Sequence, residues 1–359
     1  MRKTPFITIL VFDYLSFFHQ GQSLAVGFKK LGYKVNIVSV KKREEIYRKC
    51  KGDIIISVGY WRHWPLIYRE PIKRKRKVFP WLVSDDKVLD FVDEINQCPV
   101  LFVTSNFCRR TFEKAGVKKG IIEIIPEGID TDFWKPVVKE EIEKIKSILS
   151  LRKDNKKVIL LTIGGDGTSK GAQEVLSAIR RIPFLNILYF IKTGTGKDSL
   201  FEGLREKKLI NRFGLKDKVR YIMGYFSNEF IRALINLCDI YVAPSRHEGF
   251  GLPHIQAMAC GKPVITCKGT AAEETSLNGI TGYVVSSRPT RCKNVVGYTV
   301  DGVKANVNEL EEALKKLILD KKLRETMGKN ARKHIIKNYE SKKMAQVFLE
   351  KLKLYTDSF

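Results

Sequence analysis

The sequence lacks the residue patterns with which proteins hold a structural metal ion. Its seven cysteines form no CxxC pair and show no zinc-type spacing, and its five histidines do not pair at ligand spacing. We therefore expect no metal and no cofactor. The odd cysteine number does not suit a disulfide framework, so reduced thiols in a cytoplasmic protein are the simplest interpretation.

Long apolar runs are absent as well. No run approaches the roughly 20 residues that a helix needs to span a bilayer, so we do not expect an integral membrane protein. The first residues resemble a signal peptide only weakly, because Asp13 ends the apolar run and no small-residue cleavage site follows. We interpret residues 6–12 as a first buried strand.

Basic residues are in large excess and give a net charge of +26. Such a charge suits an acidic partner, but it is spread over both halves of the chain without a recognition motif, so we expect no specific nucleic acid. One basic cluster, Lys73–Lys77, is flanked by Trp61, Trp64, Tyr68 and Trp81. This mixture is typical of contact with an anionic membrane surface, on the inner face for a cytoplasmic protein; a solvated loop is the alternative.

Short apolar runs alternate with amphipathic stretches along the chain. Strands are predicted at 6–12, 35–40, 53–58, 78–83, 100–104 and 121–125, and again at 158–163, 187–191, 219–223, 240–243 and 263–266. Continuous Val/Ile/Leu runs are typical of buried parallel strands. The sequence therefore predicts an α/β protein with two Rossmann-like, doubly wound domains that face each other across a cleft.

Composition sets the expected boundaries. The first domain covers 1–137, a polar linker helix lies within 138–156, the second domain covers 157–338, and a last helix at 339–359 crosses back to the first domain. Ligands of such sheets bind at the carboxyl ends of the strands. The chemistry is therefore expected in the loops at those ends.

The segment from Asp239 to Ile265 carries the most specific signal. It runs from a strand through Glu248-Gly249-Phe250-Gly251-Leu252 into a helix that begins near Pro253 and ends at Gly261. The glycines let backbone N–H groups approach a ligand, and the positive end of the helix dipole suits a phosphate. Glu248 is placed to accept hydrogen bonds from a polyhydroxylated ligand. A tight turn with a solvated glutamate is the alternative.

This segment resembles the donor-site signature of the retaining, metal-independent glycosyltransferases with the GT-B fold, commonly called family 4. Further matches follow in order along roughly residues 20–340: Thr104-Ser105-Asn106, Ile125-Pro126-Glu127-Gly128-Ile129-Asp130, Gly164 to Gly171, Gly224-Tyr225-Phe226-Ser227, and Glu274 through Gly282. The resemblance implies a nucleotide-sugar donor, an acceptor hydroxyl and retention at the anomeric carbon. It also implies a role in cell-envelope, glycolipid or glycoprotein glycan synthesis, with a lipid-linked or protein-linked acceptor.

The family's motifs assign roles to individual residues. Glu248 matches the glutamate that contacts the transferred sugar, Gln256 stands where a second glutamate holds the ribose, and Lys170 matches a lysine on the diphosphate. An amide can accept one ribose hydroxyl and donate to another. The resemblance implies Glu248 and Lys170 as catalytic residues, in a donor site of Gly164, Gly165, Lys170, Tyr225, Phe226, Arg246, Glu248, Gly249, Phe250, Gly251, Leu252 and Gln256.

The chain departs from the family at three places. Gly165 stands where an arginine usually binds the diphosphate; Arg246 or Lys192 are candidate substitutes, although either could equally be solvated. A Gly-Gly pair after the first strand is absent, and Ser84-Asp85-Asp86 replaces a sugar-contacting histidine. Candidates on the acceptor side are His19, Gly21, His63 and Asp85. A lone histidine among aromatics is more often structural, and one of the two aspartates could instead cap a helix starting near Lys87.

Two other functions stay open at this stage. Gln256 and Gly165 are compatible with a degenerate, non-catalytic nucleotide-sugar-binding protein, and the net charge of +26 with a GT-B protein that binds or modifies nucleic acid. Donor hydrolysis or transfer in vitro separates the first alternative from an enzyme. Salt-dependent binding to duplex DNA at nanomolar affinity would support the second.

Overall fold

The computed structural model describes residues 5–73, 76–85, 87–151, 157–164, 169–194, 197–293 and 299–357. The chain forms two compact units: Met1–Thr131 together with Lys337–Phe359, and Asp132–Ile336. Within these described ranges, no helix is both long enough and apolar enough to cross a membrane.

The first unit is built on a parallel six-stranded sheet with the order β2-β1-β3-β4-β5-β6. The strands are β1 (Ile7–Phe12), β2 (Val35–Val40), β3 (Ile54–Gly59), β4 (Lys77–Leu82), β5 (Leu101–Val103) and β6 (Ile122–Ile124). The main helices are α1 (Leu15–Lys30), α2 (Arg43–Lys49), α5 (Asn106–Lys114) and α14 (Ser341–Leu352), with short turns at α3 (Glu70–Lys73) and α4 (Val92–Ile95).

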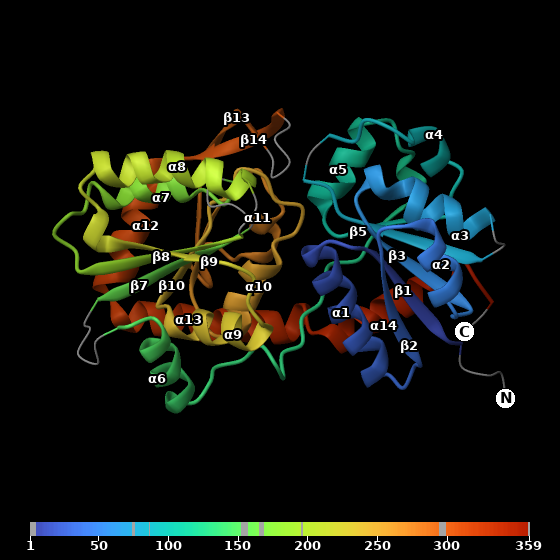
Figure 1. Cartoon of the computed structure of the whole chain (residues 1–359), viewed down its shortest axis with the longest axis horizontal. Helices are drawn as coiled ribbons and strands as arrows, with labels where there is room; N and C mark the ends of the chain where they lie inside the picture. The colour runs from blue at the N-terminus through green and yellow to red at the C-terminus, as the bar shows by residue number, and fades with distance from the viewer. Residues whose placement is uncertain are drawn as a thin grey trace. The chain divides into compact units, whose positions relative to one another are not determined.

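The last helix, α14, belongs to this first unit although it is far from it in sequence. Phe348 of α14 lies against Phe28 of α1, with ring centroids 6.2 Å apart, and against Phe102 of β5, at 4.8 Å. The chain enters α14 beside residue 129, where the Ser341 N–H donates to the Ile129 carbonyl. Figure 1 shows α1 and α14 next to each other in this unit. Together they bury one face of the first sheet.

The aromatic residues near the basic cluster are part of the core. Trp61, Trp64 and Tyr68 are 7%, 0% and 8% exposed and lie in turns that pack on the sheet, and Trp81 is 1% exposed within β4. The expectation that these aromatics lie at a membrane surface is therefore wrong. Their large apolar area drives them inside. Of the basic residues, Lys73, Arg76 and Lys77 are exposed, while residues 74 and 75 lie outside the described ranges.

The second unit is built on another parallel six-stranded sheet, with the order β12-β11-β10-β7-β8-β9. Its strands are β7 (Val158–Ile163), β8 (Ile187–Thr193), β9 (Val219–Met223), β10 (Ile240–Val242), β11 (Val264–Cys267) and β12 (Gly282–Val285). Two doubly wound parallel sheets confirm the predicted α/β class.

Helices cover both faces of the second sheet. They are α6 (Lys139–Ile148), α7 (Ala172–Ile179), α8 (Lys197–Arg212), α9 (Asn228–Leu237), α10 (Leu252–Ala259), α11 (Ala272–Thr275), α12 (Val307–Leu319) and α13 (Lys321–Asn338), whose last two residues count with the first unit. Figure 1 shows α7 and α8 on one face and α9 and α13 on the other. The helix α8 was not predicted from the sequence.

A small antiparallel hairpin follows the second sheet. It consists of β13 (Ser287–Lys293) and β14 (Thr299–Ala305), paired from Ser287↔Ala305 to Lys293↔Thr299. The sequence analysis did not predict it. The hairpin contacts the loop that carries Glu248, as described below.

Candidate functional site

The two residues predicted as catalytic lie in loops at the carboxyl ends of the central strands of the second sheet. The strand order reverses between β7 and β10, which are hydrogen-bonded neighbours, so the loops that leave these two strands start side by side and lead in opposite directions. In open parallel sheets this switch point is where ligands bind. The loop after β7 contains Lys170, and the loop after β10 contains Glu248.

Lys170 and Glu248 form an ion pair across the two loops. The Lys170 Nζ lies 2.6 Å from Glu248 Oε2, and the two side chains are only 19% and 16% exposed. The Ser245 hydroxyl lies 3.4 Å from the same carboxylate oxygen. On the other side, the Ala271 N–H donates to the Glu248 carbonyl and fixes its backbone. The two residues predicted as catalytic are thus in direct contact, 78 positions apart in sequence.

Close packing of the two loops explains this contact. The Arg246 N–H donates to the Ser169 carbonyl at 2.8 Å, which ties the loops together immediately before Lys170. Gly171 has φ +79°, and a Cβ there would lie 2.3 Å from the Pro244 carbonyl oxygen. Only glycine satisfies both the left-handed backbone and the close approach. Gly171 therefore lets the Lys170 loop lie against the Glu248 loop.

The glycine segment after Glu248 leads directly into α10. Gly251, with φ +100°, precedes the first helical residue Leu252, and Pro253 occupies the first turn, where its missing N–H costs nothing. The Phe250 side chain is 3% exposed and packs in the interior. The segment therefore offers backbone amides and the positive end of a helix dipole, while its aromatic residue anchors it.

Gln256 lies on α10, one turn after the helix begins at Leu252, and is 8% exposed. Its neighbour His254 is buried, and one of its ring nitrogens, Nε2, lies 2.7 Å from the Ser276 hydroxyl. Burial lowers the pKa of His254 to about 3. The sequence analysis did not single out His254. Its neutral ring links α10 to the segment after α11.

Arg246 is occupied by a buried carboxylate. Its guanidinium lies 2.8 Å from Glu174 Oε1 and 3.2 Å from Gln173 Oε1, both on α7, and Glu174 is 1% exposed. Its backbone is also engaged, because the Val303 N–H of the hairpin donates to the Arg246 carbonyl at 2.7 Å. The side chain of Arg246 therefore balances Glu174 and fastens α7 to the donor loop.

The loop after β9 presents two aromatic rings. Tyr225 and Phe226 are 70% and 37% exposed, and Phe226 stacks on Phe230 of α9 with centroids 4.3 Å apart. Phe226 also lies 6.0 Å from the ammonium of Lys192, the residue before the last of β8. Gly164 lies next to Lys192, because its N–H donates to the Lys192 carbonyl. Gly165, the position of the missing arginine, lies outside the described residues.

The acceptor-side candidates of the first unit are built differently. His63 stacks on Phe12 at 3.6 Å, and its Nδ1 accepts from the Tyr60 N–H. Burial lowers its pKa to about 4, so it is a neutral packing residue near pH 7. Gly21 is buried in α1, where a Cβ would lie 2.6 Å from the Val11 side chain. Both residues have a structural reason to be present.

The other acceptor-side candidates follow strands β1 and β4. His19 lies on α1 with its ring 6.4 Å from that of Phe18. Asp85 follows β4, and Asp86 lies outside the described residues. The predicted helix near Lys87 begins only at Val92, so Asp85 does not cap it.

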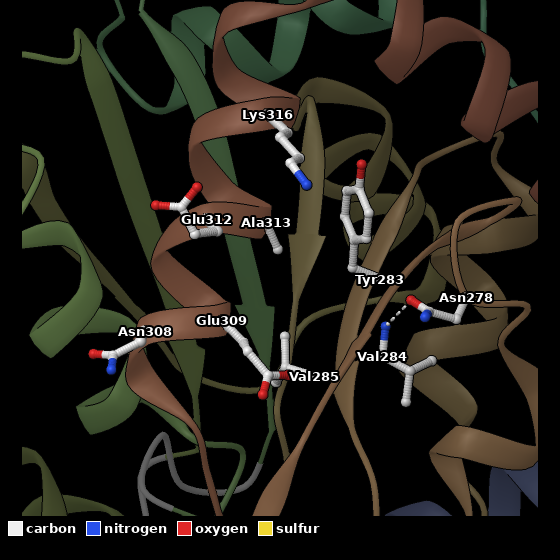
Figure 2. A pocket seen from close by; sticks show the side chains of 9 residues that line it. All are labelled: Asn278, Tyr283, Val284, Val285, Asn308, Glu309, Glu312, Ala313 and Lys316. Carbon is white, nitrogen blue, oxygen red and sulfur yellow. Dashed lines mark hydrogen bonds between the residues drawn. The ribbon is translucent and has the colours of Figure 1, made fainter.

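A cavity of about 420 Å³ lies elsewhere in the second unit, between β12 and α12 (Figure 2). It shares no residue with the predicted donor site. Its lining residues are Asn278, Tyr283, Val284, Val285, Asn308, Glu309, Glu312, Ala313 and Lys316. The carboxylate of Glu309 is already bonded to the backbone N–H of Ser286 at 2.7 Å. This cavity is therefore a surface feature around the start of α12. The candidate site is identified by the loop residues described above.

Comparisons with known proteins cover this region of the chain. Residues 143–291 match the family model described as "Glycosyl transferases group 1". An uncharacterized glycosyltransferase of Methanocaldococcus jannaschii is 29% identical over 174 residues, which are 48% of this chain and 41% of that protein. The capsular polysaccharide biosynthesis glycosyltransferase CapM of Staphylococcus aureus is 34% identical over 124 residues, 34% of this chain and 27% of that protein. The chain spans less than half the length of these relatives.

Solved structures match over nearly the whole chain. The Anabaena protein HepE, crystallised in complex with UDP and glucose, has a TM-score of 0.77 at 16% identity, covering 97% of this chain and 99% of that one. A glycosyltransferase from Rickettsia africae has a TM-score of 0.75 at 18% identity, covering 96% and 97%. The predicted GT-B fold is confirmed, and so is the predicted resemblance: residues 143–291 match the model of the group 1 glycosyltransferases.

Proposed function

We propose, on the premise that residues 143–291 match the model of the group 1 glycosyltransferases, that this protein transfers a sugar from a nucleoside-diphosphate sugar to an acceptor hydroxyl with retention at the anomeric carbon. The observation that carries the proposal is the ion pair of Lys170 and Glu248 at the switch point of the second sheet, with the start of α10 behind it. A cation, a carboxylate and a helix N-terminus together match the needs of a sugar diphosphate.

In this proposal Lys170 stabilises the diphosphate leaving group. As the glycosidic bond to the donor breaks, negative charge builds on the diphosphate, and groups that stabilise it there lower the barrier. An ammonium has three N–H donors, so Lys170 can donate to phosphate oxygens while it keeps its bond to Glu248. The amides of residues 249–252 and the dipole of α10 add positive potential at the same place.

Glu248 is the group that positions the sugar in this proposal. Its carboxylate is acceptor-only when ionised, and Lys170 holds one of its two oxygens. The other oxygen can accept hydrogen bonds from sugar hydroxyls. We propose that no protein nucleophile is needed and that the leaving phosphate takes the acceptor proton, as the family resemblance implies.

The nucleoside is assigned to the neighbouring groups. The exposed rings of Tyr225 and Phe226 offer a surface for a base, and the Gln256 amide can both accept from and donate to ribose hydroxyls. Similarity to named glycosyltransferases, CapM among them, favours catalysis over non-catalytic binding and over a nucleic-acid function. A cell-envelope, glycolipid or glycoprotein acceptor, a cytoplasmic location and contact of Lys73–Lys77 with an anionic membrane surface are further parts of the proposal.

A donor screen tests the proposal. Panels of UDP-, GDP- and ADP-sugars should include at least one compound that raises the melting temperature of the protein, because a ligand that binds only the folded state stabilises it. The same compound should then be consumed when acceptors are supplied, and Glu248→Ala should lower the rate of its consumption by about 10²- to 10³-fold. Stabilisation of both proteins without consumption by either would instead support the non-catalytic alternative.

A further inference from the structure

Lys192 is a buried lysine at the carboxyl end of β8. Its side chain is 7% exposed, and burial lowers the pKa of its ammonium. Within the described ranges, neither a carboxylate nor a hydrogen-bond acceptor contacts its Nζ, and burial is the only influence found on its pKa. Buried lysines are rare unless paired, because the charge loses its hydration. Lys192 is thus a buried cation that has no anionic partner among the described residues.

The position of Lys192 adjoins the candidate donor site on two sides. In the sheet it pairs with Ile163, the last residue of β7, and its carbonyl accepts the Gly164 N–H at 3.0 Å. The loop that leads to Lys170 therefore starts beside the backbone of Lys192. On the other side, its ammonium lies 6.0 Å from the centre of the Phe226 ring. The backbone of Lys192 therefore contacts the start of the proposed phosphate loop, and its ammonium lies near the proposed base surface.

The other cations of the site already have partners. Arg246 is held by Glu174, which is 1% exposed, and Lys170 is held by Glu248. Removing Arg246 from Glu174 would leave a carboxylate buried and unbalanced, which is costly. Binding of a diphosphate by Lys192 would leave no described carboxylate unbalanced in this way. The arginine that the family places at position 165 is a glycine here, so the site lacks one positive charge.

We infer that Lys192 binds the diphosphate of the donor and takes the role of the arginine that this chain lacks at position 165. The inference rests on the proposed function, since it names a further binding residue of the same site. A diphosphate brings negative charge to a cation that is already desolvated and held by the sheet. Little further desolvation of the lysine is therefore needed on binding, and the interaction is stronger than at an exposed lysine.

The experiment compares wild type with Lys192→Met, which keeps the length of the side chain and removes its charge. Affinities for UDP, GDP and ADP, and for the matching free nucleosides, are measured by isothermal titration calorimetry. Lys268→Met is the control, because Lys268 is an exposed lysine of the same unit. For the diphosphate that wild type prefers, we expect Lys192→Met to lose about 10- to 100-fold in affinity. Nucleoside affinity should change less than about twofold, as should all affinities of the control.

A second readout separates ligand binding from a structural role. Removing a buried charge that has no partner among the described residues should leave the melting temperature of the ligand-free protein unchanged or raise it. The stabilisation that the diphosphate gives should shrink. Equal diphosphate affinity in wild type and Lys192→Met would overturn this inference and leave the proposed function standing. Loss of nucleoside and diphosphate affinity together with a lower melting temperature would also overturn it, in favour of a structural lysine. If wild type binds none of the three diphosphates, the proposed function fails and the inference falls with it.

Discussion

The two sheets have the same kind of switch point but fill it with different chemistry. In the first unit, the end of β1 and the elements after β1 and β3 bring Phe12, Phe17, Tyr60 and His63 into one aromatic cluster, with His63 held neutral. In the second, the loops after β7 and β10 bring an ion pair, glycines and the start of a helix together. Topology fixes where a ligand can bind in such sheets, and the side chains at that place decide whether it is an anion site.

The largest expected effect comes from removing Glu248. Glu248→Ala should lower the rate of transfer by about 10²- to 10³-fold, because the sugar loses the carboxylate that positions it. Turnover is measured with the donor found in the screen, and circular dichroism checks the fold. The matched change in the first unit, His63→Phe, should alter turnover less than about threefold. Comparable losses of turnover in both variants would contradict the proposed difference between the two switch points.

Lys170→Met should come next in size. Loss of a charge-assisted contact to the diphosphate should cost about 1.5–3 kcal/mol in transition-state stabilisation, a fall of about 10- to 100-fold in kcat/KM. The Lys170→Met, Glu248→Ala double variant tests whether the two residues act at one site. Because the two residues are in contact, their effects should not add. Strictly additive effects would contradict a shared site.

Gly171→Ala tests the packing that brings the two loops together. The new Cβ would meet the Pro244 carbonyl oxygen at 2.3 Å in a backbone with φ +79°, so we expect a loss of unfolding free energy on the order of 2–4 kcal/mol. Gly214→Ala is the control, because Gly214 has φ +66° with nothing within 4 Å of a Cβ. It should cost about 1 kcal/mol. Chemical denaturation measures both, and equal costs would show that the close approach is unimportant.

His63 should control the acid stability of the first unit while leaving catalysis nearly unchanged. Its pKa is lowered from 6.5 to about 4, so the unfolded chain binds a proton between these values and the folded protein does not. Its stabilising effect is therefore present above pH 6.5 and is lost as pH falls, by about 2 kcal/mol at pH 5. His63→Phe should reduce the fall in melting temperature between pH 7 and pH 5. An unchanged fall would show that His63 titrates normally.

Much of the fold follows from local sequence. Short apolar-rich stretches predicted Val35–Val40 and Val219–Met223 to the residue. The helix α5 starts after Ser105, whose hydroxyl accepts the Cys108 N–H. The helix α8 was missed because its sequence is strongly charged and has only a weak apolar period. The hairpin of β13 and β14 was missed because its strands are polar, with Pro289 in the first of them. Its pairing depends on contacts made elsewhere in the fold.

The candidate site could be predicted as a set of residues but not as an arrangement. The family resemblance singled out Lys170 and Glu248, yet nothing local shows that they form an ion pair. The partner of Arg246 is Glu174, 72 positions away, and this pairing separates Arg246 from Lys192 as candidate phosphate cations. The burial of Trp61 and Trp64 likewise depends on the turn after β3 packing on the sheet. Burial and pairing over long sequence distances require the fold.

A crystal structure of the protein with the nucleotide sugar that stabilises it most tests the central claim directly. The account predicts the diphosphate within hydrogen-bond distance of Lys170 Nζ at the start of α10, with the sugar hydroxyls at Glu248. A nucleotide bound away from the loops after β7 and β10, for example in the cavity between β12 and α12, would contradict it.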